Sequence, residues 1–447
     1  MLIQILHPLL LSNRISISRS MYYICHFIRS SFKIPMQSDI NKEIEKIYKS
    51  ESGRVLASLV RILGDFDLAE EAKQEAFGIA LEKWPEEGIP KNPCSWLISA
   101  GKFKAIDSIR RAKRGRELVS EKFPYNDSYT EDPVLENDLV DDNQLRLIFF
   151  CCHPLLPLDS RIALSLRDVC GMRTEEIARA YLVSSETIKK RISRAKILFR
   201  EKKIPYEIPS GPELNNRMDA VLHVIYLIFN EGYSASSGED HIRKELTDEA
   251  IYLCRKLVDL ISTPESLGLL ALLLLQESRR TSRITENGDI IPLERQDRSL
   301  WNQNLIREGL ELINQAVMSG RLGYYTLQAA ITSVHTVADS LQNTRWDIII
   351  GYYDMLLSIN PSPVIELNRA IAVGMHDGPE SGLTIINDLI EKGKLNSYHL
   401  VYSAKADFSK KLGLNEEAVK AYKKAIGLAR QEPERRYLEN QLLEITK

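Results

Sequence analysis

Hydrophobic residues recur at helical spacing along almost the whole chain from Ile40 onward. Apolar positions repeat every three or four residues, which places them on one face of an α-helix, and no stretch alternates convincingly with the period of two typical of a half-buried strand. Proline and glycine gather at 85–93, 205–212 and 360–363, where they mark breaks between helices. The pattern therefore predicts an all-α protein.

An acidic, proline-bearing stretch interrupts this helical pattern. Between Phe123 and Leu145 there are seven Asp and Glu residues and two prolines, but no Lys or Arg. Such a composition is typical of a flexible linker, which we assign to 117–142. The linker separates a first helical domain, 36–116, from a second, 143–204, and a much larger all-helical extension occupies 205–447.

The first 35 residues differ from the rest in composition. They contain four basic residues and no acidic one, and their apolar start is broken by Pro8. No small-residue cleavage site of the kind that ends a signal peptide follows. We favour a protein that begins at Met36 behind an upstream start codon, and a membrane-touching arm is the alternative.

Composition narrows the functional classes. A net charge of −2 with 27% charged and 44% hydrophobic residues is ordinary for a globular protein. The longest apolar run, 267–275, is less than half of the ~20 residues that a membrane-spanning helix needs, so it predicts the buried centre of a helix. Six cysteines without a repeated spacing indicate a reducing compartment, and we expect a cytoplasmic protein.

Candidate chemistry is sparse. The run Cys151-Cys152-His153 lacks a second Cys/His pair at zinc spacing, which favours buried thiols over a metal site. The chain has no glycine-rich phosphate loop and no recognisable nucleophile–base pair. We therefore expect neither an enzyme nor a cofactor.

The segment 65–84 is an amphipathic helix with an acidic face. Its apolar stripe consists of Ala69, Ala72, Ala76, Ile79, Ala80 and Trp84. The opposite face carries Glu70, Glu71, Gln74 and Glu75. Such a face is either solvated or docks onto a basic partner.

The segment 96–116 is a helix that starts apolar and ends basic. From Lys102 to Arg116 seven basic residues face a single acid, Asp107. A favourable interaction with the helix dipole explains two or three of these charges, but not seven. Basic residues beside aromatic ones are typical of contacts with the phosphates and stacked bases of a single strand.

Residues 173–200 read as a short helix, a turn and a second helix rich in Lys and Arg. Thr174 is the candidate cap of the first helix and Ser184 of the second. In the second helix Ile188, Ile192 and Ala195 face inward, whereas the polar residues from Ser185 to Lys196 face outward. This is the arrangement of a helix-turn-helix unit with a recognition helix. Leu182 is unusual, because many such turns have glycine with positive φ there.

Three motifs in this order resemble the extracytoplasmic-function sigma factors of bacterial RNA polymerase. They are AEEAKQEAF, NPCSWLISAGKFKAIDSIRR and, after the acidic linker, EIARAYLVSSETIKKRISRAK. The resemblance covers about 40–204, with sigma region two at 36–116 and the region four helix-turn-helix at 143–204. It implies a promoter-specificity factor whose partners are promoter DNA and core RNA polymerase, through its β′ clamp helices and β flap.

The resemblance also implies roles for individual residues. The set matching the helix that binds the β′ clamp helices is Asp67, Glu70, Glu71, Gln74 and Glu75. The set matching the helix that engages and melts the minus-ten element is Trp96, Lys102, Lys104, Asp107, Arg110 and Arg111. The set matching the helix that reads the minus-thirty-five element is Ser185, Glu186, Thr187, Lys189, Lys190 and Arg191, and we add Arg194 to the DNA-binding residues. Phe103 stands where the family usually has Asn, and an aromatic ring there can stack on an unpaired base.

The long extension contains segments similar to tetratricopeptide units. One is 401–429, with small and aromatic residues at Tyr402, Ala406, Gly413, Ala418, Tyr422 and Ala425, and a degenerate one is 361–390. The whole chain thus resembles the sigma factors with a C-terminal tetratricopeptide-like domain. The resemblance implies that this domain regulates activity, through a bound regulatory protein or peptide.

Two other functions remain open from the residues. The chain could be a stand-alone helix-turn-helix regulator with a helical-repeat sensor domain, or a helical-repeat scaffold whose basic stretches are solvated. A simple regulator has no use for a strand-melting helix and an acidic polymerase-docking face. A scaffold does not explain why basic residues cluster in two helices.

Overall fold

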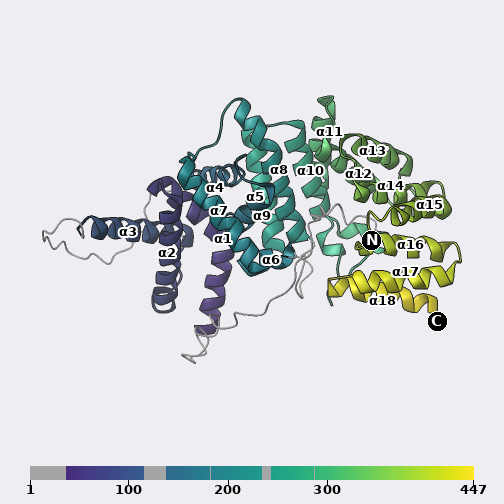
Figure 1. Ribbon diagram of the computed structural model, residues 1–447, viewed down its shortest axis with the longest axis horizontal. Coiled ribbons are helices and arrows are strands. Elements are labelled where there is room, and N and C mark those ends of the chain that lie inside the picture. Colours follow the sequence, from purple (N-terminus) through teal and green to yellow (C-terminus); the bar gives the residue numbers. More distant parts are fainter. Residues whose placement is uncertain (1–36, 115–136, 182, 234–242, 286, 447) are drawn as a thin grey trace. The chain divides into compact units, whose positions relative to one another are not determined.

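The structure is a computed structural model that describes residues 37–114, 137–181, 183–233, 243–285 and 287–446. The described residues form eighteen α-helices, three short 3-10 helices and no strand beyond an isolated bridge between Ile284 and Ile290 (Figure 1). The predicted all-α class is confirmed. Within the described ranges, no helix combines the length and apolarity needed to cross a bilayer.

The chain divides into two compact units, and the boundary falls between Val224 and Ile225 inside helix α8. The helices of the first unit are α1 (Gln37–Leu63), α2 (Phe66–Glu87), α3 (Pro93–Arg114), α4 (Asn137–Cys151), α5 (Leu158–Asp168), α6 (Thr174–Ala180), α7 (Ser185–Lys202) and the first half of α8 (Pro212–Tyr233).

Helices α1, α2 and α3 pack against one another as a small bundle. The predicted apolar stripe of α2 forms its core, because Ala69, Ala76, Ala80 and Trp84 are almost fully buried. The start of α2 is fixed by Asp65, whose carboxylate accepts a hydrogen bond from the backbone N–H of Leu68 at 2.8 Å. Helix α4 packs on α1, and α5 and α6 both pack on α7.

The second unit continues through the rest of the chain. Its elements are α9 (Lys244–Leu260), α10 (Pro264–Glu277), η1 (Arg280–Ser282), η2 (Leu293–Arg295), η3 (Arg298–Leu300), α11 (Gln303–Met318), α12 (Tyr324–Val337), α13 (Trp346–Ile359), α14 (Pro363–His376), α15 (Pro379–Glu391), α16 (His399–Lys411), α17 (Asn415–Leu428) and α18 (Glu432–Thr446).

Helix α10 is the centre of this second unit. It packs against α9, α11 and α12, and every residue from Ser266 to Glu277 is buried. The apolar run 267–275 is therefore a buried helix centre, as predicted. A capping box between Thr263 and Ser266 and a proline at the first helical position fix where it begins.

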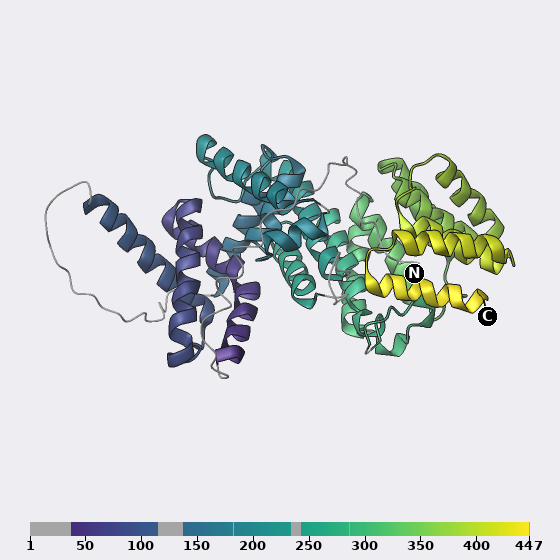
Figure 2. The ribbon, with the colours of Figure 1, turned by 60° about the horizontal axis from the view of Figure 1, so that its bottom comes forward.

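From α13 to α18 each helix packs on the next along the chain (Figure 2). Small residues permit this packing. A Cβ added to Gly382 of α15 would lie 2.8 Å from the backbone carbonyl oxygen of Ala370 in α14. In the last helices Ala406, Ala418, Tyr422 and Ala425 are buried. Whether these pairs are tetratricopeptide units stays a prediction.

The acidic linker ends earlier than predicted. Residues 137–142 are the first turns of α4, whereas the composition placed them in the linker. The physical reason is that acidic residues are also favoured in the first turn of a helix, where the dipole is positive. The remainder of the predicted linker, 117–136, and the N-terminal extension, 1–35, lie outside the described residues.

The burial of α10 leads to a stability prediction. Leu272→Ala should lower the free energy of unfolding of the second unit by about 2–5 kcal/mol, because Leu272 is fully buried and its removal leaves a cavity. Hydrogen exchange of the α10 amides, followed by mass spectrometry, measures this change. Leu443→Ala is the control, because this helical leucine is 53% exposed and should change stability by only ~0.5 kcal/mol.

Candidate nucleic-acid and protein interfaces

The predicted acidic face of α2 is present but only partly exposed. Glu71, Gln74 and Glu75 lie on the surface. Glu70 and Asp67, which belong to the same predicted set, instead contact basic residues from the later helices α5 and α7. The face therefore consists of an open part and an occupied part.

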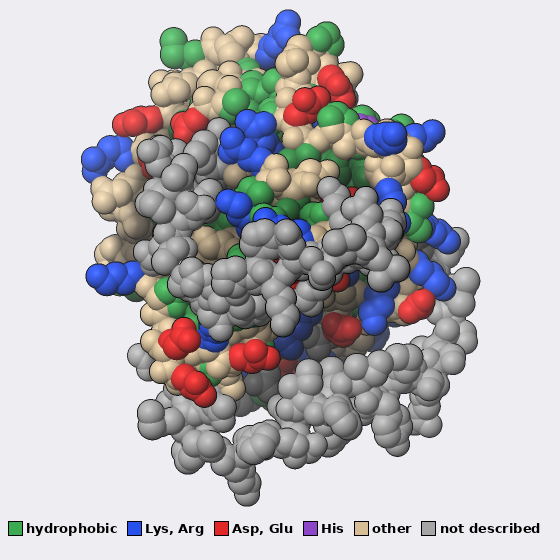
Figure 3. Space-filling model, turned by 90° about the vertical axis from the view of Figure 1, so that its left-hand side faces the viewer, with side chains coloured by type: hydrophobic (Ala, Val, Ile, Leu, Met, Phe, Trp, Pro, Cys, Tyr) green, Lys and Arg blue, Asp and Glu red, His purple; other side chains and the backbone are tan. Residues whose placement is uncertain are grey.

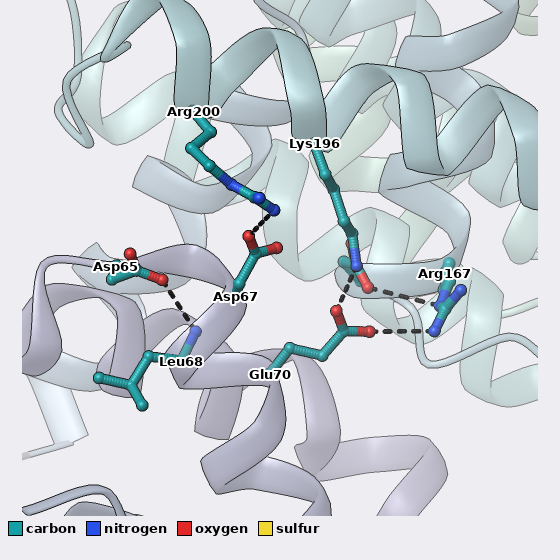
Figure 4. A network of polar contacts seen from close by, with 8 residues as sticks. Asp65, Asp67, Leu68, Glu70, Arg167, Lys196 and Arg200 are labelled. Carbon is teal, nitrogen blue, oxygen red and sulfur yellow. Dashed lines mark hydrogen bonds and ion pairs between the residues drawn. The ribbon is translucent and has the colours of Figure 1, made fainter. Parts of the chain in front are cut away.

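The occupied part is a network of ion pairs (Figure 4). Glu70 lies between Lys196 of α7, which contacts one carboxylate oxygen, and Arg167 of α5, whose Nη2 lies 3.0 Å from the other. One turn further along α7, Arg200 pairs with Asp67. Lys196 also lies over the ring of Phe66, 5.2 Å from its centroid.

Buried charges behind Glu70 extend this network. Lys73 and Asp168 are almost completely buried, and the Lys196 Nζ and Arg167 Nε lie 3.9 and 3.8 Å from the two Asp168 oxygens. Burial lowers the pKa of Lys73 and raises the pKa of Asp168. Burial alone would also raise the pKa of Glu70, but Lys196 and Arg167 outweigh it and hold that pKa below its ordinary value.

The predicted DNA-binding residues of α3 differ in exposure. Trp96 is only 7% exposed and packs edge-to-face on Trp84, with ring centroids 5.2 Å apart. The start of α3 therefore belongs to the bundle core, and the DNA contact expected of Trp96 stays a prediction. Phe103 is 42% exposed, Arg110 is exposed, and Lys102 and Lys104 are half-buried. The side chain of Arg111 lies outside the described residues.

Two apolar residues of α3 were not singled out by the sequence. Ile106 and Ile109 are exposed, and with Phe103 they follow one another at three-residue steps. On the side of the molecule to which α2 and α3 belong, Lys and Arg side chains lie beside hydrophobic ones (Figure 3).

Helix α7 has the geometry predicted for the second helix of the pair. The Ser184 hydroxyl accepts a hydrogen bond from the backbone N–H of Thr187 at 3.1 Å, which confirms the cap. Ile188, Ile192 and Ala195 are buried, as predicted.

The surface of α7 differs from the prediction at one basic residue. Lys196 was placed on the outward face, but its side chain is only 12% exposed because it pairs with Glu70. At the start of the helix Ser185 and Thr187 are half-buried, whereas Glu186, Lys189, Lys190 and Arg194 are exposed. Arg191 is held by Asp159 of α5 at 2.8 Å, and Lys190 lies 3.7 Å from Glu186.

The first helix of the pair starts one residue earlier than predicted. Thr174 is its first helical residue, and Arg173 precedes it as the cap, with its backbone N–H donating to Glu176 at 2.8 Å. Leu182, the unusual turn residue, lies outside the described residues. The thiols of Cys151 and Cys152 are buried, and burial raises the pKa of both.

Comparison with known proteins identifies this helix pair. Residues 146–198 match the family described as sigma-70, region 4, and residues 217–317 match a family described as being of unknown function (DUF6596). Uncharacterized protein R00370 of Rhizobium meliloti (strain 1021) is 40% identical over 393 residues, which cover 87% of this chain and 92% of the relative. The chain belongs to the family of this Rhizobium protein.

A second relative supports a sigma-70-type factor. It is the ECF RNA polymerase sigma factor SigK of Mycobacterium ulcerans (strain Agy99), which is 24% identical over 152 residues, or 33% of this chain and 79% of the relative. No solved structure matches the chain. At this level the chain is a sigma-like transcription factor with a sigma-70 region 4 domain, which contains α5, α6 and most of α7.

A cavity of about 520 Å³ lies between α1, the start of α2 and region 4. Phe66, Phe150, Phe199 and Tyr206 form aromatic parts of its lining. The basic residues that line it are Arg61, Arg146, Lys196, Arg200 and Lys203, against the two acids Asp65 and Asp67. The seam between α1–α2 and region 4 is therefore positively charged.

The burial of Trp96 leads to a stability prediction. Trp96→Ala should lower the free energy of unfolding of the first unit by about 3–5 kcal/mol, because it removes a large buried ring. Phe103→Ala, on the exposed part of the same helix, should change it by only about 0.5 kcal/mol. The two variants are compared by unfolding in urea, monitored through hydrogen exchange of the α2 amides. Equal losses of stability would contradict the assignment of Trp96 to the bundle core.

Proposed function

We propose that this protein is a promoter-specificity sigma factor, which binds bacterial core RNA polymerase and directs it to start transcription. The observation that carries the proposal is the match of 146–198 to sigma-70 region 4, on a helix pair whose second helix exposes Lys189, Lys190 and Arg194. Small polar residues at the start of α7 and basic residues along it suit base reading and phosphate contact.

The acidic face of α2 supports polymerase binding. Its open part consists of Glu71, Gln74 and Glu75, which are exposed on a helix whose opposite stripe is fixed in the bundle core. Two carboxylates fixed on one face of a helix are complementary to a basic protein surface. On the proposed function, this surface belongs to the β′ clamp helices.

Helix α3 supports contact with a melted strand. Phe103 is exposed beside Lys102 and Lys104, so an aromatic ring and two cations lie at neighbouring positions. Stacking of a base on such a ring contributes about 1–3 kcal/mol, and cations hold the backbone. Ile106 and Ile109 add an apolar ridge that can pack against unstacked bases.

The second unit is proposed to be the regulatory part. From α13 to α18 each helix packs on the next along the chain, an arrangement that in repeat proteins forms protein-binding surfaces. On this proposal the unit binds a regulatory protein or peptide.

Reversing the charge of the open acidic face tests polymerase binding. Glu71→Lys/Glu75→Lys should abolish binding to core polymerase and leave the fold intact, because both side chains are exposed. Affinity for purified core polymerase is measured without DNA. Glu311→Lys/Glu391→Lys is the matched control, because it reverses two exposed glutamates of the second unit. Unchanged affinity of the α2 variant for core polymerase would contradict the proposal.

In vitro transcription separates this function from a stand-alone regulator. Core polymerase, the full chain and fragmented genomic DNA are combined, and the 5′ ends of the transcripts are sequenced. A sigma factor produces new start sites that share upstream elements and disappear with Glu71→Lys/Glu75→Lys. A stand-alone regulator binds DNA without core polymerase and produces no such start sites.

A further inference from the structure

We propose that region 4 is a latch that closes over the polymerase-binding face of α2, so that the protein described here is the closed, inactive form. The inference rests on the proposed function. The partner of the occupied acidic face is then a surface of the same chain, the flank of α7 that carries Lys196 and Arg200.

The acidic face of α2 and the basic flank of α7 are complementary in charge. Of the five α2 residues predicted to bind polymerase, Asp67 and Glu70 are paired with α7. Arg167 holds Glu70 from a second helix of region 4. Outside α2, Arg173 pairs with Glu45 of α1 at 2.5 Å. A basic polymerase surface has to displace these cations before it can contact Asp67 and Glu70.

The backbones of α1 and region 4 also pack closely. A Cβ added to Gly53, in the middle of α1, would lie 2.0 Å from the carbonyl oxygen of Val169 in region 4. Only glycine permits this approach, although glycine inside a helix costs about 0.5–1 kcal/mol relative to alanine. Nearby, the Tyr206 hydroxyl donates to the Asn143 carbonyl at 2.9 Å and lies 3.3 Å from that of Ala57. The closed arrangement is therefore a shaped interface and more than a chance ion pair.

The size of the closed unit also limits which DNA elements it can contact. The minus-ten and minus-thirty-five elements lie about 25 base pairs apart, which is ~85 Å along straight B-DNA. A compact body of about 200 residues is only ~45 Å across. In the closed unit α3 and α7 are thus too close to hold both elements at once.

Two full-length variants open the latch by different routes. Lys196→Glu/Arg200→Glu replaces attraction to Glu70 and Asp67 by repulsion. Gly53→Ala changes no charge, should stabilise α1 as a helix, and places a methyl group against the Val169 carbonyl in the closed form only. Lys91→Glu/Lys202→Glu is the charge control, because both residues are exposed in the first unit and belong to none of the predicted contact sets. Gly351→Ala is the glycine control, because its Cβ would meet nothing within 4 Å.

Two readouts are needed. A zero-length carbodiimide joins a carboxylate and an amine that are in contact, so the yield of the Glu70–Lys196 amide, measured by peptide mass spectrometry, reports the closed form without polymerase. The affinity for core polymerase reports the availability of the α2 face. Gly53→Ala should lower the crosslink yield at least threefold, whereas Gly351→Ala should not change it.

The affinity measurement decides the role of the contact. Both opening variants should bind core polymerase about tenfold more tightly or better, because they remove the population penalty of the closed form, and both controls should match the unmodified chain. Absence of the Glu70–Lys196 crosslink in the unmodified chain would overturn the latch. So would an unchanged affinity in Gly53→Ala despite a lower crosslink yield. If core polymerase binds none of the proteins, the proposed function itself fails, and this outcome is distinct from the other two.

Discussion

The pairing of Glu70 with Lys196 and Arg167 is the interaction on which the first unit depends. Behind it lie Lys73 and Asp168, two ionisable groups that are almost fully buried. A buried charge is tolerated only when opposite charges surround it. Because Lys73 and Asp168 belong to α2 and α5, their mutual neutralisation favours the packing of region 4 against α2. The position of region 4 is therefore set by electrostatics as much as by apolar contact.

The two carboxylates of this network respond to pH in opposite directions. The pKa of Glu70 is held below its ordinary value of 4.5, so its contribution to stability is present above that pH and is lost as the pH falls through the lowered pKa. Burial raises the pKa of Asp168, so its ionisation costs stability as the pH rises through the raised value. Near neutral pH Glu70 stays ionised, which makes proton uptake by this residue a poor trigger for opening. Competition for its cations is a better one.

Sequence patterns predicted the helices well and their partners poorly. The all-α class, the buried stripe of α2 and the Ser184 cap follow from local periodicity and local hydrogen bonding, and the structure confirms them. Lys196 was misplaced because it lies at the edge of the buried stripe of α7, where a cation can face either solvent or an acid on a distant helix. Trp96 belongs to a motif that resembles a DNA-binding helix, and the sequence alone does not show that its ring also fills the core at the start of α3. Such errors arise where tertiary contacts decide between two locally equivalent faces.

On the proposed function, the same two surfaces make polymerase and DNA cooperate in opening the proposed latch. Core polymerase competes with α7 for the carboxylates of α2, while DNA phosphates compete with those carboxylates for the cations of α7. Each partner therefore favours the open form that the other requires, and linkage makes this coupling reciprocal. The Arg200–Asp67 pair is largely exposed, so it contributes at most ~1 kcal/mol to the closed form. A latch made of ion pairs suits this competition, because the ligands that open it replace its charges with equivalent ones of their own.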